Sequence, residues 1–353
     1  MLSAITHPDM ARIVARHGLV AVPVDLDLET LQPRGDLLEQ ALTARTRALV
    51  VAHLFGARAD LDEAVGFCRR HGLVLVEDCA QALRSPDDAG DQRSDAALFS
   101  FGSIKTAPAL GGAVAYIREP TVRTRMRRAQ EPWPAQRRRD YALRVLRFVG
   151  LLALGRPFVY ELFVRAGRRA GLDVDALVNR SVHALKPPSS AEADEFGVWL
   201  RRRPSAPLLA LLRRRLTTFD HDRLRRRSAR GEQAAEAIPR SLFHPGRAAQ
   251  ERTHWVFPVA FRAPSRAIEA LRDAGFDATA ATTSISAIEA PPDRPKLQPE
   301  GSLRLLEHVV FLPVYPELPQ RAFERLLETL RQLEDEGLGE ALAGVKSREP
   351  VRG

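Results

Sequence analysis

Lysine is scarce in this sequence. Only four of the 53 lysine and arginine residues are lysines, and the other 49 are arginines. The amine of a lysine can lose its proton and attack a carbonyl group, whereas a guanidinium effectively cannot. Lys105 stands among predicted strands and shortly before the glycine pair Gly111-Gly112. Its position therefore indicates chemistry that arginine cannot perform.

Cysteine is scarce as well, and a targeting segment is missing. Cys68 and Cys79 form neither a CxxC pair nor a zinc-like cluster, so we expect free thiols and no metal site. The start MLSAITHPDM has no basic region followed by an apolar one, so we expect no secretory signal peptide. Both observations predict a protein of the reducing cytoplasm.

Long hydrophobic runs are also absent. Within the apolar segment 142–163, the uncharged run from Phe148 to Gly155 is far shorter than the ~20 residues that a membrane-spanning helix needs. Arginines flank this run on both sides. Two interpretations stay open: an interfacial helix that lies on an anionic membrane, or a helical insertion that packs on the protein or on a second subunit.

Arginine, in contrast, is abundant. The net charge is +9 and the isoelectric point is near 10.3. Such a charge suits an acidic partner such as a nucleotide or a membrane surface. The alternative is a compositional bias that places arginines on solvated faces. The arginines are spread along the chain without a nucleic-acid-binding motif, so we expect no nucleic-acid partner.

Residues 8–125 alternate predicted helices and apolar strands, which is typical of an α/β fold with a mainly parallel sheet flanked by helices. In such sheets, ligands bind beyond the carboxyl ends of the strands, where Asp78 and the segment before Lys105 fall. The expected strands are Leu19–Val24, Ala48–Ala52, Leu73–Val76, Ala96–Phe101 and Gly112–Ile117. The expected helices are Pro8–Gly18, Leu37–Ala44 and Leu61–His71.

The sequence after residue 200 predicts a linking helix and a small second domain. A leucine- and arginine-rich helix is expected from Pro207 to Leu224, followed by a small C-terminal α+β domain. That domain should contain strands His254–Phe261 and Val309–Leu312 and helices Pro264–Ala274 and Leu318–Glu334. We divide the chain into a large domain (1–120), a helical insertion (121–200), a linking helix (201–240), the small domain (241–336) and a tail (337–353).

Asp78 ends a buried-looking strand 27 residues before Lys105. A strand-end carboxylate and a downstream lysine are the two groups that an enzyme using pyridoxal 5'-phosphate (PLP) needs. The stretch from Thr6 to Tyr116 resembles the DegT/StrS-type sugar aminotransferases, which are PLP enzymes of the aspartate-aminotransferase fold. The matching pieces are Thr6-His7, Val22-Pro23-Val24-Asp25, His53-Leu54-Phe55-Gly56, Glu77-Asp78-Cys79-Ala80-Gln81, and Ser100-Phe101 to Lys105 followed by Gly111-Gly112. Weaker likeness at Arg203–Leu216 and Leu312–Leu318 extends the resemblance to most of the chain outside residues 121–200.

The resemblance implies a role for each of five residues. Lys105 would bind PLP covalently and move a proton between substrate and cofactor. Asp78 would pair with the pyridine nitrogen, and Gln81 would hydrogen-bond the 3-oxygen of the ring. Ser100 would bind the cofactor phosphate, and His7 would stack on the ring. We take His53 as structural.

Each residue also has a structural interpretation. Asp78 could cap a following helix, and Gln81 could be an ordinary polar residue of that helix. Ser100 could hydrogen-bond neighbouring backbone. His7 and Lys105 could lie on the surface without any part in chemistry.

The resemblance implies an aminotransferase that moves an amino group, with glutamate as the donor, to a nucleotide-linked keto-sugar or a related carbonyl compound, in polysaccharide or secondary-metabolite biosynthesis. A shared active site would make it a homodimer. One departure stands out: family members have residues before the equivalent of Thr6, including a glycine- and threonine- or serine-containing turn at a helix N-terminus that holds the PLP phosphate. We therefore expect weak PLP binding by the chain as given. The alternative is a non-catalytic paralogue that acts as the structural partner of an active homologue.

Overall fold

The computed structural model describes residues 1–154, 193–280 and 285–339. These residues form two compact units. Unit 1 comprises residues 1–100, 113–119 and 218–353, and unit 2 comprises residues 101–112 and 120–217. Residues 340–353 of the predicted tail and residues 155–163 of the predicted apolar segment lie outside the described residues. The five-part division of the chain stays a prediction.

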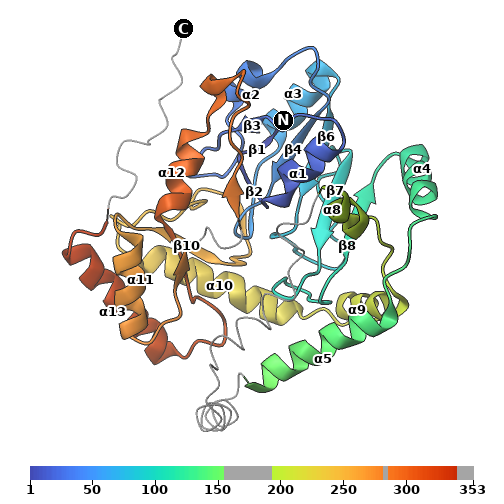
Figure 1. Ribbon diagram of the computed structural model, residues 1–353. Coiled ribbons are helices and arrows are strands. Elements are labelled where there is room, and N and C mark those ends of the chain that lie inside the picture. The colour runs from blue at the N-terminus through green and yellow to red at the C-terminus, as the bar shows by residue number, and fades with distance from the viewer. Residues whose placement is uncertain (155–192, 281–284, 340–353) are drawn as a thin grey trace. The chain divides into compact units, whose positions relative to one another are not determined.

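A six-stranded sheet forms the centre of unit 1 (Figure 1). Its strand order is β3-β1-β4-β6-β7-β8, and all neighbouring strands are parallel except β7 and β8. The strands are β1 (Leu2–Ser3), β3 (Pro23–Val24), β4 (Ala48–Ala52), β6 (Val74–Asp78), β7 (Ala96–Ser100) and β8 (Ala113–Ile117). The predicted α/β class with a mainly parallel sheet is therefore confirmed. β1 was not predicted, and it lies inside the sheet between β3 and β4.

Amphipathic helices cover this sheet because their apolar sides pack against its strands. Side chains of α2 and α3 form one buried cluster with residues of β4 and β6. The three helices of this part are α1 (Asp9–Arg16), α2 (Gly35–Ala41) and α3 (Asp62–His71). α3 ends as predicted at Gly72, whose φ of 61° is the left-handed conformation that glycine accepts without strain.

The predicted strand Leu19–Val24 is wrong in its first half. Only Pro23 and Val24 form a strand, because Leu19 belongs to the turn that ends α1: its backbone N–H donates to the carbonyl of Val14 at 3.2 Å. The side chains of Leu19 and Val20 are exposed rather than paired into the sheet.

The C-terminal part of unit 1 contains the small α+β layer that the sequence predicts. Its three-stranded sheet has the order β10-β13-β11, and both pairs are antiparallel. Leu271, Phe276, Phe323 and Leu330 are among the side chains of its buried core. The strands are β10 (Phe257–Ala260), β11 (Thr279–Ala280) and β13 (Val309–Leu312), and the helices are α10 (His221–Ala237), α11 (Pro264–Asp273), α12 (Glu300–His308) and α13 (Gln320–Asp335).

Short pairings join the early chain of unit 1 to its late chain. Two antiparallel pairs connect residues more than 190 positions apart, and a short 3-10 helix precedes α12. These elements are β2 (Ile5–Thr6) with β12 (Ser286–Ala287), β5 (Ala57–Arg58) with β9 (Glu251–Arg252), and η2 (Pro295–Leu297).

The described residues of unit 2 outside the loop 101–112 are mostly helical. Its described helices are α4 (Pro120–Gln130), α5 (Arg138–Leu154), α8 (Ala193–Leu200) and α9 (Ala206–Thr217). The single helix expected from Pro207 to Leu224 is wrong: α9 ends at Thr217, and α10 begins at His221. Asp220 starts the second helix, because its carboxylate accepts a hydrogen bond from the N–H of Arg223 at 2.7 Å.

Candidate active site

The candidate residues of unit 1 follow the carboxyl ends of parallel strands. Asp78 is the last residue of β6, and Ser100 is the last residue of the neighbouring strand β7. His7 follows β1 and β2, and β1 runs parallel to β4 in the same sheet. Since parallel strands end at the same edge, the sheet brings Asp78 and Ser100 to one edge, where α/β proteins bind ligands, whereas His7 follows β2, which pairs with β12 outside this sheet.

Asp78 is held in a turn rather than at a helix. Its carboxylate accepts a hydrogen bond from the N–H of Ala80 at 3.0 Å, and its carbonyl accepts one from the N–H of His53 at 3.0 Å. Residues 79–95, all of them described, contain no helix. Asp78 therefore does not cap a helix, and Gln81 is not a helical residue. The half-buried carboxylate ends its strand at the edge of the sheet.

Gln81 supports the turn that follows β4. Its side-chain oxygen accepts a hydrogen bond from the N–H of Phe55 at 2.8 Å. Phe55 and Gly56 both have positive φ, and a Cβ atom at Gly56 would lie 2.4 Å from the backbone nitrogen of Trp255. Only glycine fits this turn. Because the oxygen of the Gln81 amide is engaged, its N–H₂ end is the end that can donate to a ligand.

His7 lies at the surface of the described residues, with 62% of its side chain exposed. Its Nδ1 accepts a hydrogen bond from the N–H of Asp9 at 3.2 Å, at the start of α1. This contact fixes the ring near the helix start, but it does not by itself show a ligand-binding role.

Lys105 belongs to unit 2, in the loop 101–112. Hydrogen bonds at Phe101 close the base of this loop: its carbonyl accepts from the N–H groups of Ala109 and Gly111, and its N–H donates to the carbonyl of Gly112. Within the loop, the N–H of Lys105 donates to the carbonyl of Gly102 at 3.2 Å. The half-buried lysine is thus presented on a closed loop that begins directly after Ser100.

Side chains of α5 and α9 hold three successive carbonyls of this loop. The hydroxyl of Tyr141, which is 2% exposed, donates to the carbonyl of Ala109 at 2.7 Å. Arg144 donates to the carbonyl of Leu110 at 3.0 Å, and Arg215 donates to that of Pro108 at 3.1 Å. The helices of unit 2 therefore fix the loop that carries Lys105.

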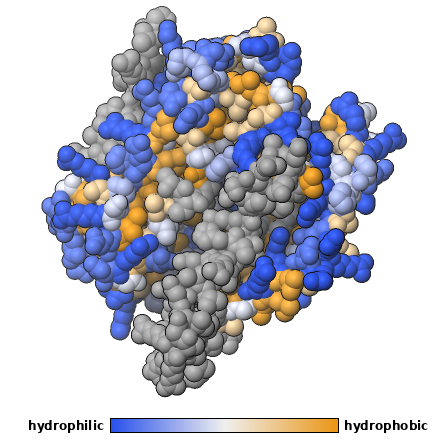
Figure 2. Space-filling view, viewed as in Figure 1, coloured by the Kyte–Doolittle hydropathy of each residue, from blue (hydrophilic) through white to orange (hydrophobic). Residues whose placement is uncertain are grey.

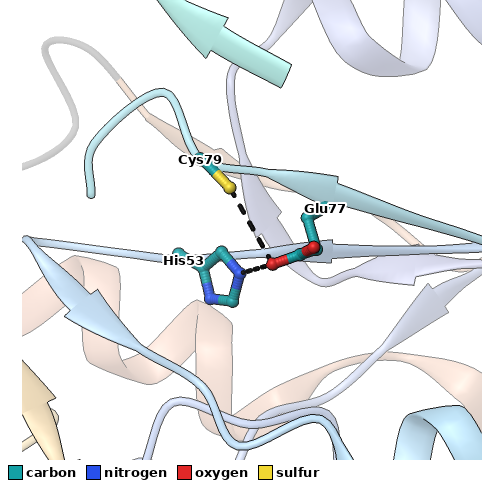
Figure 3. A group of neighbouring side chains, drawn as sticks. All are labelled: His53, Glu77 and Cys79. Atoms are coloured by element: carbon teal, nitrogen blue, oxygen red, sulfur yellow. Dashed lines mark hydrogen bonds and ion pairs between the residues drawn. The ribbon is translucent and has the colours of Figure 1, made fainter. Parts of the chain in front are cut away.

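A buried polar network lies next to Asp78 along β6. Glu77 and Cys79, its two neighbours in the chain, point toward His53 in Figure 3. The Glu77 carboxylate is 3.0 Å from His53 Nε2 and 3.3 Å from the guanidinium of Arg58. Arg58 also reaches Cys79 Sγ at 3.0 Å. Since side chains alternate along a strand, Glu77 points to the sheet face opposite that of Asp78.

Charge is balanced inside this network. Burial acts to raise the pKa of Glu77, but hydrogen bonds from His53 and Ser94 outweigh it, and the pKa of Glu77 falls below its usual value. Burial lowers the pKa of His53 and raises the pKa of the Cys79 thiol. The network therefore holds an ionised Glu77 and Arg58 with a neutral histidine and a neutral thiol.

His53, Glu77 and Cys79 lie near enough together to suggest a metal site, but their hydrogen bonds argue against one. His53 Nδ1 accepts from the N–H of Ala59 at 3.1 Å, so its Nε2 carries the proton and donates to Glu77. Neither ring nitrogen then offers a lone pair, and Arg58 supplies the positive charge. We assign a structural role to this group, as predicted for His53.

The structure thus brings Asp78, Gln81, Ser100 and His7 into unit 1 and places Lys105 in unit 2. Sequence analysis missed Arg58 and Tyr141. A cysteine, a histidine and a carboxylate at β-strand ends could have suggested the buried network. No local pattern marks Tyr141, because its partner carbonyl is 32 residues away.

Comparisons with known proteins agree with this arrangement. The model of the DegT/DnrJ/EryC1/StrS aminotransferase family matches residues 1–144. The erythromycin biosynthesis sensory transduction protein EryC1 of Saccharopolyspora erythraea is 43% identical over 119 residues, which cover 32% of each chain. The dTDP-4-dehydro-2,3,6-trideoxy-D-glucose 4-aminotransferase of Saccharopolyspora spinosa is 26% identical over 227 residues, covering 58% of this chain and 59% of the relative. The chain thus spans less than two thirds of the length of these relatives.

Solved structures extend the likeness in fold beyond the matched sequence. The crystal structure of the aminotransferase TlmJ from Streptoalloteichus hindustanus has a TM-score of 0.61 with 20% identity, covering 95% of this chain and 78% of that one. At this identity the likeness shows the fold alone. Residues 1–144 thus match the DegT/DnrJ/EryC1/StrS aminotransferase family, and the described chain has the fold of these solved aminotransferases.

Proposed function

We propose that the protein is a PLP-dependent aminotransferase that acts on a keto-sugar, with a nucleotide-linked sugar as the preferred substrate and glutamate as the amino donor. Its context would be polysaccharide or secondary-metabolite biosynthesis, and its form a cytoplasmic homodimer. One observation carries the proposal: Asp78 and Ser100 end adjacent parallel strands of one sheet, and the only lysine of the matched segment follows Ser100 by five positions.

The residues present suit PLP. Asp78 offers a half-buried carboxylate at the sheet edge, and the donor end of the Gln81 amide is available beside it in the chain. Ser100 offers a hydroxyl for a phosphate oxygen. Lys105 offers an amine on a loop closed by hydrogen bonds. In the proposed site, Asp78 would pair with the pyridine nitrogen, Gln81 would hydrogen-bond the 3-oxygen, Ser100 would bind the phosphate, and His7 would stack on the ring.

When bound, PLP supplies an electron sink that stabilises negative charge on the substrate carbon. The Asp78 carboxylate would favour the protonated pyridine nitrogen, because a negative charge nearby favours the protonated form. Lys105 would hold the cofactor through its amine, and its Nζ would take a proton from the substrate carbon and return it. The hydrogen bonds to the carbonyls of Pro108, Ala109 and Leu110 would limit the positions of that amine.

Reduction with borohydride tests the proposal. Protein incubated with PLP should retain one covalent adduct at Lys105, and glutamate should discharge it before reduction. Lys105→Ala should lose the adduct completely, while the matched variant Lys296→Ala, at an exposed lysine, should keep it. An adduct that persists in Lys105→Ala would disprove the assignment. Adduct formation without any discharge by glutamate would favour the non-catalytic paralogue.

A further inference from the structure

Side chains of α10 hold the chain of unit 1 at the end of β9. The carboxylate of Glu232 accepts hydrogen bonds from Arg252 Nε and from His254 Nε2, each at 2.9 Å. Between these two residues, the carbonyl of Thr253 accepts from Arg227 Nε at 2.7 Å. Hydrophilic residues make up much of the face shown in Figure 2, but Arg227, Thr253 and His254 are buried, so their polar groups depend on partners inside the protein. α10 therefore fixes three successive residues.

His254 has a backbone conformation that a residue with a Cβ atom rarely adopts. Its φ of 44° lies in the left-handed region. The ring packs directly on the backbone of α10, where a Cβ atom at Gly231 would lie 2.1 Å from the Cγ of the ring. The ring also lies 5.7 Å from that of Phe257, centroid to centroid. An unfavourable backbone of this kind persists only where its surroundings hold it, so we attribute it to the packing of the ring and its bond to Glu232.

The connecting segment 253–256, between β9 and β10, holds the turn that follows β4. The carbonyl of Gly56 accepts from the N–H of Thr253 at 2.8 Å and from its hydroxyl at 3.1 Å. The N–H of Val256 donates to the carbonyl of Phe55 at 3.4 Å. Phe55 also has a left-handed φ, of 59°. The turn thus contains a second unfavourable backbone conformation, and its shape depends on the connecting segment.

This turn orients the carboxamide of Gln81. The N–H of Phe55 donates to Gln81 Oε1 at 2.8 Å. Because a carboxamide is planar, a bond to its oxygen also limits the direction of its N–H₂ group. Contacts therefore connect Glu232 on α10 with Gln81 after β6, and all of them lie within unit 1.

We propose that Glu232 is a positioning residue for Gln81. Acting through His254 and the connecting segment, it sets the shape of the turn at Phe55 and thereby the direction of the Gln81 N–H₂ group. The ligand that this group meets, the 3-oxygen of PLP, rests on the proposed function. A purely structural Glu232 would only attach α10 to β9, and its loss would lower the free energy of unfolding without any effect on Gln81.

Amide hydrogen exchange in the full-length protein without PLP tests the coupling. The variant Glu232→Gln keeps the length of the side chain but replaces an ionised acceptor by a neutral one. The amide of Phe55 should then exchange ~5-fold faster, and Gln81→Ala, which removes its acceptor, should have at least this effect. Glu236→Gln changes an exposed carboxylate one turn further along α10 and should have no effect. An unchanged exchange rate at Phe55 in Glu232→Gln would overturn the proposal.

Two variants of His254 separate the contribution of its backbone from that of its packing. His254→Ala removes the ring but keeps a Cβ atom in the unfavourable conformation, whereas asparagine adopts the left-handed region more readily. His254→Asn should therefore raise the exchange rate of the Phe55 amide less than His254→Ala does. Equal effects would show that only the volume of the ring matters, which would contradict the part of the proposal that His254 carries.

PLP affinity tests the link to the cofactor site. Gln81→Ala should weaken PLP binding ~10-fold, and Glu232→Gln should weaken it by a smaller factor. In the double variant, Glu232→Gln should cause no further loss, because its effect passes through Gln81. Circular dichroism establishes that each variant is folded. Losses that multiply in the double variant would overturn the proposal. A wild-type protein that binds no PLP would refute the proposed function alone, since exchange at Phe55 still decides whether Glu232 positions Gln81.

Discussion

Arginine serves different purposes in the two units. In unit 1, Arg58 is buried between Glu77 and Asp88, and Arg84 joins the same network through Asp88. In unit 2, arginines lie on exposed helices with few acidic neighbours, and those with visible contacts, such as Arg144 and Arg215, bind backbone carbonyls. The net positive charge of the sequence thus comes from unit 2, whose residues include 22 basic and 8 acidic ones, counted over the full sequence.

This difference separates structural charge from surface charge. A buried arginine cannot be removed without leaving its carboxylates uncompensated. An exposed arginine has little effect on stability and remains available for a partner. The residues of the proposed reaction also come from both units. Unit 1 supplies Asp78, the counter-charge, and unit 2 supplies the amine of Lys105.

Removal of one arginine from each unit should give the largest difference in the free energy of unfolding. Arg58→Met should lower the free energy of unfolding by ~3–5 kcal/mol, because it leaves Glu77 and Asp88 buried without a cation. Arg127→Met on α4 should change it by less than ~0.5 kcal/mol. Urea unfolding measures both. Equal effects at the two positions would contradict the distinction between the units.

The variant Asp78→Asn tests whether Asp78 of unit 1 is the counter-charge of the pyridine nitrogen. Loss of the charge should slow the transfer of the amino group by roughly 100-fold, the equivalent of ~2 pKa units on the pyridine nitrogen. PLP should still bind and still form the adduct at Lys105. Asp95→Asn is the control, since this carboxylate accepts from the N–H of Leu75 at the other end of β6. Near-normal single-turnover rates in Asp78→Asn would exclude its role as counter-charge.

As the pH falls, unit 1 should lose stability before unit 2 does. Burial lowers the pKa of His244 to about 4, and burial also lowers the pKa values of His53 and His254, all in unit 1. The unfolded chain, with a histidine pKa near 6.5, binds protons at a higher pH than the folded chain does. The stabilisation is therefore complete above pH ~6.5 and is lost as the pH falls toward 4, by ~2 kcal/mol at pH 5 for His244 alone.

His244→Phe should reduce this acid dependence, and His221→Phe, at an exposed histidine, should not. Urea unfolding between pH 7 and pH 4 measures the slope. Hydrogen exchange resolved by segment should show unit 1 opening first, since the described residues of unit 2 contain no histidine. An acid dependence that is the same with and without His244 would show that its burial does not matter.

The smallest expected effect concerns the loop of Lys105. Tyr141→Phe removes the hydrogen bond to the carbonyl of Ala109 and leaves a buried acceptor unpaired, at a cost of ~1 kcal/mol. Amide exchange within 101–112 should rise ~5-fold, and the adduct at Lys105 should form more slowly. Tyr315→Phe changes an exposed tyrosine of unit 1 and should leave both unchanged. Unaltered exchange in the loop would show that Tyr141 does not restrain it.

Much of unit 1 could be predicted from the sequence because its signals are local. Apolar runs such as Ala48–Ala52 form strands, and Gly72 ends α3. The strand-end carboxylate Asp78 could be found for the same reason. β1 could not be predicted, since two residues do not show a periodicity. The break between α9 and α10 was missed because the Leu- and Arg-rich pattern continues across it, while the capping carboxylate of Asp220 ends it.

The candidate site was only partly predictable for a related reason. The residues of the resemblance carry their motif with them, whereas Tyr141, Arg144 and Arg215 act through side chains that meet carbonyls far away in the sequence. Arg58 is one arginine among 49, and only its contacts with Glu77 and Asp88 in the folded protein distinguish it.

The hold on the loop of Lys105 has a thermodynamic consequence. Side chains of α5 and α9 bind three of its carbonyls in the protein without any ligand. Much of the conformational entropy of the loop is therefore lost on folding, so that a ligand at Lys105 does not have to offset it on binding. Preorganisation of this kind raises affinity without adding a contact to the ligand.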